Sequence, residues 1–309
     1  MRRSGRGGTT RGRVHRLPTT VPAIPCAVTV RRWLRQAGAM PELPEVESVV
    51  RQLRPRMVGR RIVDVWWDPQ SRFAALDRAV GRVITGLRRR GKYMLAPLQG
   101  DGPADRELVM HLGMTGAFRL REDGWAGDPY VRATLTLDDG VVDFRDVRRF
   151  GRLTVVPVGD YRGIATLAQL GPEPLGLDFR PHGFHAALAA SRAPVKAQLL
   201  SQRPVAGVGN IYADEALWLA RIDPRARRLG RERATRLWGA VRSVLRDAIE
   251  REGTTFRDYQ MVNGESGRNA TFLVAYGQQG QPCPRCGTAL RKIVVAGRGT
   301  TYCPGCQRI

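Results

Sequence analysis

The chain has 309 residues, of which 42% are hydrophobic and 26% are charged, a balance typical of an ordinary globular protein. No apolar run approaches the roughly 18 residues needed to span a bilayer, which excludes a protein with transmembrane helices. The formal net charge of +23 indicates a polyanionic partner such as a nucleic acid, although a generally arginine-rich proteome would produce the same excess.

The first 39 residues lack the patterns of a folded segment. They are rich in Arg, Gly, Thr and Pro, contain no acidic residue and show neither helical nor strand periodicity. The apolar stretch Val21–Val30 is broken by Pro22 and Pro25, so a secretory signal fits poorly. We expect residues 1–39 to be a disordered or non-native extension, either a transit peptide or the product of a misassigned start codon, with order beginning at Met40.

The next part of the chain predicts a leading helix followed by an antiparallel β-sandwich. Apolar residues at helical spacing indicate a helix over 42–57: Val46, Val49, Val50 and Leu53. Strand-like segments follow from about residue 60 to 158: Ile62–Val65, Leu108–Met110, Ala133–Leu137 and Leu153–Val156. The turn Asp138–Gly140 joins two of these strands as a hairpin.

The remainder changes to a helical pattern from about residue 164 to 252. The clearest helices are expected over three ranges: Val195–Leu200, Ile211–Leu219 and Arg231–Arg251. The end of the chain, 275–309, is expected to form short strands around four cysteines. The predicted class is therefore α+β, with a β-sandwich domain over 40–160, a helical domain over 164–256 and a small finger over 275–309.

The cysteines give the sharpest local signal. Four of the five occur in two C-x2-C pairs separated by 16 residues: Cys283, Cys286, Cys303 and Cys306. This spacing is typical of two knuckles closing a tetrahedral Zn²⁺ site, and four thiolates leave no coordination position open, so the zinc should be structural. The fifth, Cys26, has no assignable role.

Two other segments carry possible chemistry. In Gly207–Asn210 two glycines permit close backbone approach, and Asn210 precedes a helix whose exposed amides would suit a phosphate; an ordinary helix–helix turn explains it as well.

Met40–Glu47 resembles a proline-started acidic helix N-terminus. If the chain began at Pro41, however, it would expose a secondary amine. At a pKa of about 7.8, roughly a quarter of such an amine is unprotonated near pH 7.4.

Seven segments in order resemble the formamidopyrimidine-DNA glycosylase family and cover essentially all of 40–309. They are Met40–Glu47, Arg90–Tyr93, His111–Gly116, Asp146–Gly151, Leu170–Leu175, Gly207–Asn210 and the cysteine ribbon. The resemblance implies a β-sandwich, a helix–two-turn–helix domain and a zinc finger. It also implies a bifunctional enzyme that excises oxidised purines such as 8-oxoguanine and formamidopyrimidines through a Schiff base, then cleaves the strand by β,δ-elimination.

By this resemblance Pro41 is the nucleophile, Glu42 a general acid and Glu45 a second buried acid that organises the site. Lys92 would contact phosphate and assist elimination, and Arg298 would grip DNA and serve δ-elimination. The residues expected to fill the gap left by a flipped nucleotide are Met114, Arg148 and Phe150. Those expected at phosphates or the DNA surface are Lys196, Asn210, Arg192 and His111. From the residues alone, Met114 and Phe150 would be core side chains and His111 an ordered strand-end histidine.

The sequence departs from the family pattern in four places. Val147 stands where the family has a proline, Arg192 where a lysine is usual, and a phosphate-contacting histidine is replaced around Asp128–Tyr130. The extension over 1–39 is the largest departure. If it remained attached, the Pro41 nitrogen would be a tertiary amide whose lone pair is delocalised, and no Schiff base could form.

Two alternatives stay open at this point. An endonuclease VIII-like enzyme would use the same nucleophile on oxidised pyrimidines, although Val262–Gly267 resembles the loop with which the purine-specific branch covers its lesion. A non-catalytic lesion-binding protein would keep the ribbon and the basic surface without a free Pro41. We expect a monomer that binds double-stranded damaged DNA and no membrane, acts in the bacterial cytoplasm at the nucleoid, and needs only the one zinc ion.

Overall fold

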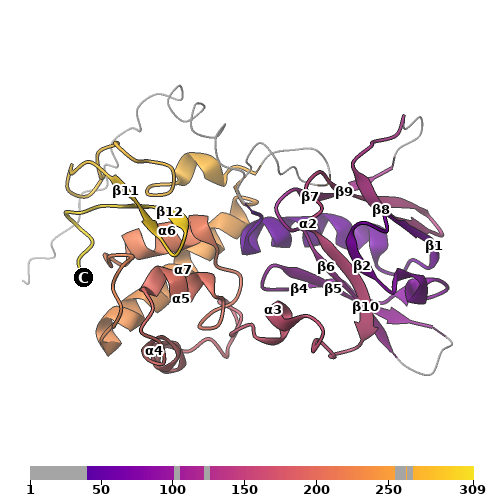
Figure 1. The fold of residues 1–309 in the computed structure, drawn as a ribbon, viewed down its shortest axis with the longest axis horizontal. Helices are drawn as coiled ribbons and strands as arrows, with labels where there is room; N and C mark the ends of the chain where they lie inside the picture. Colours follow the sequence, from indigo (N-terminus) through magenta and orange to yellow (C-terminus); the bar gives the residue numbers. More distant parts are fainter. Residues whose placement is uncertain (1–39, 101–104, 122–125, 255–261, 263–266) are drawn as a thin grey trace, which may run out of the picture.

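The computed structural model describes residues 40–309 apart from 101–104, 122–125, 255–261 and 263–266. The expectations for 1–39, for Cys26 and for most of Val262–Gly267 therefore lie outside the described residues. Two halves lie side by side, a sandwich of strands and a group of helices, and helix α2 (Leu43–Met57) reaches from one into the other (Figure 1). No helix in the described part of the chain is long and apolar enough to cross a membrane.

The sandwich consists of two sheets. The first has the order β1-β8-β9-β7: β1 Ile62–Trp67, β8 Val131–Leu137, β9 Gly140–Asp146 and β7 Gly116–Leu120. The second has the order β2-β10-β6-β5-β3: β2 Arg72–Ala74, β10 Arg152–Pro157, β6 Arg106–His111, β5 Tyr93–Gln99 and β3 Val83–Ile84. Strand β4, Arg88–Arg90, pairs with β5. Among the strands of the described ranges, every pair is antiparallel except β2 with β10, a parallel contact that the sequence did not indicate.

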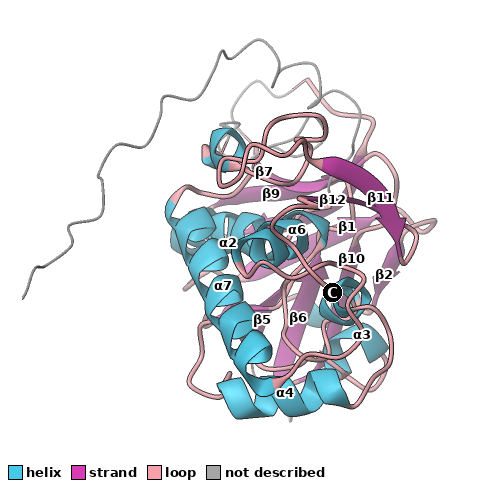
Figure 2. Cartoon of the chain, turned by 90° about the vertical axis from the view of Figure 1, so that its left-hand side faces the viewer, coloured by secondary structure: helices cyan, strands magenta, loops and turns pink. Residues whose placement is uncertain are grey.

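Within the residues that the structure describes, the helical half contains five helices and the finger two strands. The helices are α3 Ala165–Ala168, α4 Pro181–Ala189, α5 Val195–Leu200, α6 Asn210–Leu219 and α7 Arg231–Glu250. The finger strands are β11 Arg291–Val295 and β12 Arg298–Tyr302, and two 3-10 turns cover Leu76–Ala79 and Asn269–Phe272. Helix α6 lies between α7 and the β11–β12 hairpin (Figure 2). The expected α+β class, with sandwich, helical part and finger in that order, is confirmed.

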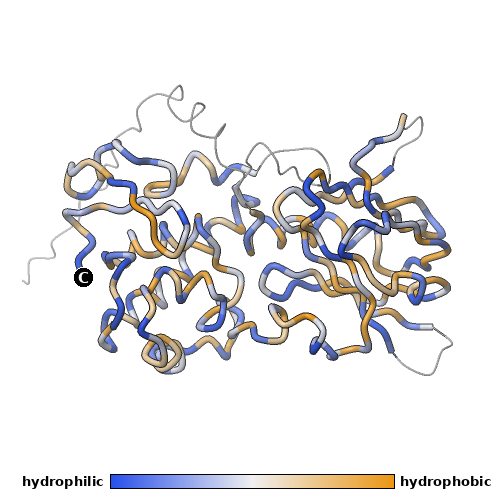
Figure 3. Tube along the Cα trace, viewed as in Figure 1, coloured by the Kyte–Doolittle hydropathy of each residue, from blue (hydrophilic) through white to orange (hydrophobic). Residues whose placement is uncertain are grey.

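Helix α2 joins the two cores. Its first apolar residue, Leu43, packs into the helical core, whereas Val46, Val49 and the apolar residues after them pack into the core of the sandwich half. Pro44 in the first turn needs no amide partner, and Glu45 there favours the helix dipole. Hydrophobic and hydrophilic positions alternate along the trace of both halves (Figure 3). The N-terminus of α2 is thereby held where the sandwich meets the helices.

Candidate active site

Glu42 places a buried carboxylate at the N-terminus of α6. Its side chain accepts hydrogen bonds from the amides of Gly209 at 2.6 Å and Ile211 at 2.8 Å, and the residue is only 2% exposed. A Cβ on Gly209 would lie 2.3 Å from the Glu42 carboxyl carbon and 2.6 Å from the Lys92 ammonium, so only glycine fits there. Burial raises the pKa of Glu42 to about 7, against the opposing influence of Lys92. Near neutral pH this group can therefore either hold or release a proton.

Glu45 is the centre of a buried network that holds Glu42. Its carboxylate accepts the Glu42 amide at 2.8 Å, the Tyr212 hydroxyl at 2.6 Å and the Thr254 amide at 2.7 Å. The Asn269 side chain in turn donates to the Thr254 hydroxyl. Burial raises the pKa of Glu45, as it does for Glu42. This network ties the start of α2 to α6 and to the segment after α7; the role of Glu45 in organising the site stays a prediction.

Lys92 lies on the turn between β4 and β5 and faces the same carboxylates. It is 7% exposed, and burial lowers the pKa of its ammonium while Glu42 and Glu45 oppose that effect. Among the described residues it makes no hydrogen bond. A lysine that is enclosed, electrostatically coupled to two acids and otherwise uncommitted is typical of a functional site rather than of a solvated surface.

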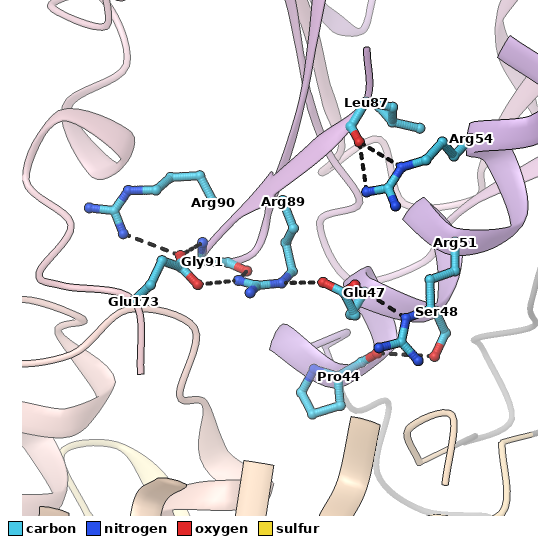
Figure 4. Close-up of polar contacts among 10 residues, drawn as sticks. All are labelled: Pro44, Glu47, Ser48, Arg51, Arg54, Leu87, Arg89, Arg90, Gly91 and Glu173. Atoms are coloured by element: carbon cyan, nitrogen blue, oxygen red, sulfur yellow. Dashed lines mark hydrogen bonds and ion pairs between the residues drawn. The ribbon is translucent and has the colours of Figure 1, made fainter. Parts of the chain in front are cut away.

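The turn that carries Lys92 is clamped by an ionic network. The Glu173 carboxylate, from the segment that leads into the helical half, accepts the Gly91 amide at 2.6 Å and the Arg89 guanidinium at 2.6 Å. Arg89 also reaches Glu47 of α2 at 2.9 Å, so it lies between two acids from different elements (Figure 4). The clamp fixes the position of Lys92 relative to α2.

Pro41 lies beside Glu42 and is buried. The backbone just after it is anchored because the Leu43 amide donates to the Gly207 carbonyl at 3.2 Å. Gly207 has φ +83, and a Cβ there would come within 2.5 Å of the Leu43 side chain. In the chain as described, the Pro41 nitrogen is an amide to Met40. The Gly207–Asn210 turn therefore not only joins two helices but also contacts the segment at the start of α2.

The expected void-filling residues come from two loops that contact each other. A Cβ on Gly113, next to Met114, would lie 2.5 Å from the carbonyl carbon of Phe150. Asp146 stabilises the second loop, which carries Phe150, because its carboxylate accepts a hydrogen bond from the Gly151 amide at 2.7 Å. Phe150 is 41% exposed, and the Arg148 guanidinium lies 4.8 Å from its ring centroid. Phe150 is therefore not a core side chain, and Met114 is half-buried, so neither fits the alternative of an interior residue.

Lys196, which was predicted to bind a phosphate, is paired with protein acceptors in the structure. It is fully buried, and its ammonium donates to Asp214 at 2.6 Å, to the Thr300 hydroxyl at 2.8 Å and to the Gly299 carbonyl at 3.2 Å. These three acceptors use all three protons, so this arrangement leaves none for a phosphate. Lys196 instead fastens the finger hairpin to α5 and α6.

The other expected DNA contacts differ in their setting. Asn210 donates to the Gly299 carbonyl at 3.1 Å, beside the exposed Arg298, whose charge lowers the pKa of Lys92. His111 accepts the Gly113 amide at its Nδ1 and is uncharged near neutral pH, because burial lowers its pKa to about 4. Arg192 is exposed ahead of α5, and its carbonyl accepts a hydrogen bond from the Arg227 guanidinium at 3.1 Å. Thus Asn210, Arg298 and His111 border the Lys92 site.

The four ribbon cysteines converge as expected. All four Sγ atoms lie within 4.8 Å of one another, with 3.9 Å between Cys283 and Cys306 and 3.5 Å between Cys286 and Cys303. A Zn–S bond of about 2.3 Å in a tetrahedron requires sulfur atoms about 3.8 Å apart. The thiolate set therefore fits one structural Zn²⁺ ion.

Sequence reasoning missed several buried acids that hold the site together. Glu215 of α6 accepts three consecutive amides of Val274, Ala275 and Tyr276 at 2.8 to 3.2 Å, and burial raises its pKa to about 7. Asp214 and Glu215 interrupt the apolar run of α6, and that interruption is a signal of buried, partnered acids. Glu173, a partly buried acid, carried no such signal, because its partners Arg89 and Gly91 lie 84 and 82 residues away in sequence.

Three family models match successive parts of the chain. The formamidopyrimidine-DNA glycosylase N-terminal domain matches residues 40–153, the H2TH domain of the same glycosylase matches 170–260, and a zinc finger found in FPG and IleRS matches 280–309. A formamidopyrimidine-DNA glycosylase of Deinococcus radiodurans is 46% identical over 278 residues, covering 87% of this chain and 97% of that protein. One of Thermus thermophilus is 48% identical over 272 residues, covering 87% and 98%.

Solved structures give the same result. The MutM (Fpg) protein of Thermus thermophilus superimposes with a TM-score of 0.80 at 47% identity, covering 86% of this chain and 98% of that one. A Lactococcus lactis Fpg variant in complex with DNA containing Fapy-dG gives a TM-score of 0.79 at 35% identity, covering 87% and 100%. Lactococcus lactis Fpg with DNA containing an abasic site gives 0.77 at 34% identity, with the same coverage.

Proposed function

This chain belongs to the formamidopyrimidine-DNA glycosylase family, and on that premise we propose that it excises oxidised purines from duplex DNA through a covalent intermediate on Pro41. It is a DNA repair glycosylase with a structural zinc finger. The observation that supports the proposed mechanism is the meeting of Glu42 and Lys92 at the N-terminus of α6, with the buried Pro41 directly preceding Glu42 in the chain. We further propose that it acts as a monomer on DNA in the bacterial cytoplasm.

The first step requires a free secondary amine at Pro41. Its lone pair forms a bond to C1′ of the damaged nucleotide while the glycosidic bond breaks and the base leaves with the bonding electrons. Opening of the sugar ring then gives an iminium, the Schiff base. An amide to Met40 cannot do this, because its lone pair is delocalised. The active form must therefore begin at Pro41, and the first family model begins just before it, at residue 40.

Glu42 assists the departure of the damaged base in this step. With a pKa of about 7 it is partly protonated at neutral pH and can deliver a proton to the sugar or the departing base. After delivery the carboxylate is stabilised by the Gly209 and Ile211 amides at the positive end of α6. The site thus accommodates both protonation states without losing its geometry.

Lys92 and Arg298 suit the elimination steps that follow. Both are cations near the carboxylate pair, and burial lowers the pKa of Lys92, so its ammonium releases a proton more readily than that of an exposed lysine. Removal of the C2′ proton expels the 3′ phosphate in β-elimination, and a second elimination expels the 5′ phosphate. Met114, Arg148 and Phe150, presented by adjoining loops, would fill the gap left by the extruded base, which offsets part of the lost stacking.

A cleavage assay on matched duplexes tests the proposal. Duplexes of one sequence would carry 8-oxoguanine, an oxidised pyrimidine or undamaged guanine at the same position, with cytosine or guanine opposite as the lesion requires. We expect rapid cleavage at 8-oxoguanine, with phosphate left on both new ends as β,δ-elimination requires. Preferred cleavage at the pyrimidine would assign the chain to the endonuclease VIII-like activity, and tight binding without cleavage would leave a lesion-binding protein.

A further inference from the structure

The loop after β9 has an unusual backbone at its tip. Arg149 has φ +54, a left-handed conformation that residues with a side chain rarely adopt. The residues on either side of it, Arg148 and Phe150, contact each other, with 4.8 Å from guanidinium to ring centroid. The left-handed residue between them therefore lets both neighbours project on one side of the loop, while the Arg149 side chain points elsewhere.

Arg149 is held by an acid that is distant in sequence. Its Nε donates to Asp68 Oδ2 at 2.9 Å, just beyond the end of β1. The Asp68 side chain is 12% exposed, and its other oxygen accepts the Gln70 amide at 3.0 Å. Because Asp68 is itself fixed, the ion pair restrains the tip of the loop and not merely a pair of mobile surface side chains.

A second arginine, Arg132, completes a network that we call the brace, formed by Asp68, Arg132 and Arg149. The Arg132 side chain of β8 is 10% exposed, lies 3.5 Å from Asp68 Oδ2 and donates to the Asp146 carbonyl at 3.1 Å. Asp68 in turn donates its amide to the Arg132 carbonyl at 2.8 Å. The contacts thus run from Asp146 at the base of the loop through Arg132 and Asp68 to Arg149 at its tip.

This brace matters because Val147 leaves the loop without a covalent restraint. A proline there, as in the motif that the loop resembles, would fix φ near −65° at the start of the turn. Valine does not. We propose that Asp68, with Arg132 and Arg149, positions the void-filling loop after β9. These residues hold the loop in the conformation in which Arg148 and Phe150 project on one side of it. The proposal rests on the proposed function, because it assumes that Arg148 and Phe150 fill the gap.

Single-turnover kinetics of Asp68→Asn test this on two substrates. One is 8-oxoguanine paired with cytosine in a duplex, where a gap must be filled. The other is an abasic site in a single strand of the same sequence, where no stacked gap exists. We expect the duplex rate to fall about tenfold, or about 1.4 kcal/mol in the barrier, and the single-strand rate to stay within about twofold. Arg149→Gln removes the other partner and should give the same pattern.

Two further variants make the test specific. Asp64→Asn makes the same charge change on the exposed face of β1 and should leave both rates unchanged. Val147→Pro in the Asp68→Asn background should restore the duplex rate to within about twofold, because proline supplies the missing restraint. The Val147 amide donates no hydrogen bond among the described residues, and Asp146 before it is in a strand, so proline is compatible there.

The outcomes separate the possibilities. Equal losses on both substrates would show that Asp68 only supports folding, and failure of Val147→Pro to restore the duplex rate would show that loop restraint is not its role; either result overturns the inference. If the wild-type protein cleaves neither substrate, the proposed function itself is wrong. Thermal unfolding of each variant, measured alongside, shows whether a lost rate reflects lost fold.

Discussion

Replacing Glu42 with glutamine removes the buried proton on which the proposed mechanism depends. The pKa of this group is about 7 in the folded chain against an ordinary 4.5. The folded state therefore holds the proton more tightly than the unfolded state does. The stabilisation this provides is complete below pH 4.5 and is lost as the pH rises through 7. Integrated from pH 5 to pH 8, the loss amounts to about 2.5 kcal/mol.

Glutamine at this position stays neutral at every pH, so the variant cannot show that loss. The difference in unfolding free energy between wild type and Glu42→Gln, measured in urea at pH 5 and pH 8, should shift by about 2.5 kcal/mol in favour of the variant at the higher pH. Glu250→Gln, at the exposed end of α7, is the matched control and should show no shift. A difference that is flat across this range would refute the assignment of a raised pKa to Glu42.

The same substitution should change the pH profile of excision. Excision by the wild type requires an unprotonated Pro41 amine, whose ordinary pKa is about 7.8, and a protonated Glu42. The excision rate should therefore follow a bell-shaped pH profile with its maximum near neutral pH. Glu42→Gln should lower single-turnover excision of 8-oxoguanine by at least about 100-fold and remove the alkaline limb. Cleavage at a preformed abasic site should suffer less, since no base has to leave. If the alkaline limb persists in the variant, Glu42 is not the acid.

Three other predictions concern separate parts of the molecule. Phe150→Ala should leave the melting temperature unchanged, because the ring is 41% exposed, yet slow excision from duplex DNA; a melting temperature that falls with activity would return Phe150 to the core. Asp214→Asn should destabilise the protein by about 3 kcal/mol in chemical unfolding, because it leaves the buried Lys196 ammonium without its counter-charge; a loss below about 1 kcal/mol would contradict that role. Chelation of zinc should make the 283–309 ribbon sensitive to protease while 40–160 stays resistant, and equal cleavage of both would show that the ion supports more than the finger.

Much of the fold followed from local patterns. Alternating strands with a turn at Asp138–Gly140, apolar helical spacing in α2 and α7, and the C-x2-C pairs are each signals that lie within a few residues of sequence, and each is confirmed. The parallel pairing of β2 with β10 was missed because β2 is only three residues long, too short for any periodicity.

The candidate site could be predicted only in part. The resemblance predicted Glu42, Lys92 and the two loops as site residues, but it did not indicate which cations form hydrogen bonds with protein acceptors. Lys196 was expected at a phosphate, yet its partners Asp214 and Thr300 come from segments 18 and 104 residues away. Contacts over such separations are set by the packing of the finger on α6, which local sequence does not encode. The same holds for Asp68 and Arg149, which are 81 residues apart.

The central claim is that the amine of Pro41 is the nucleophile, and borohydride trapping tests it most directly. Protein made from its native gene would be assayed by intact mass for its N-terminus, then reduced with borohydride on an 8-oxoguanine duplex and digested to find the modified peptide. The account predicts a chain that begins at Pro41 and a DNA adduct on that residue. An adduct on a lysine, or a chain that begins at Met1 and traps DNA equally well, would contradict it.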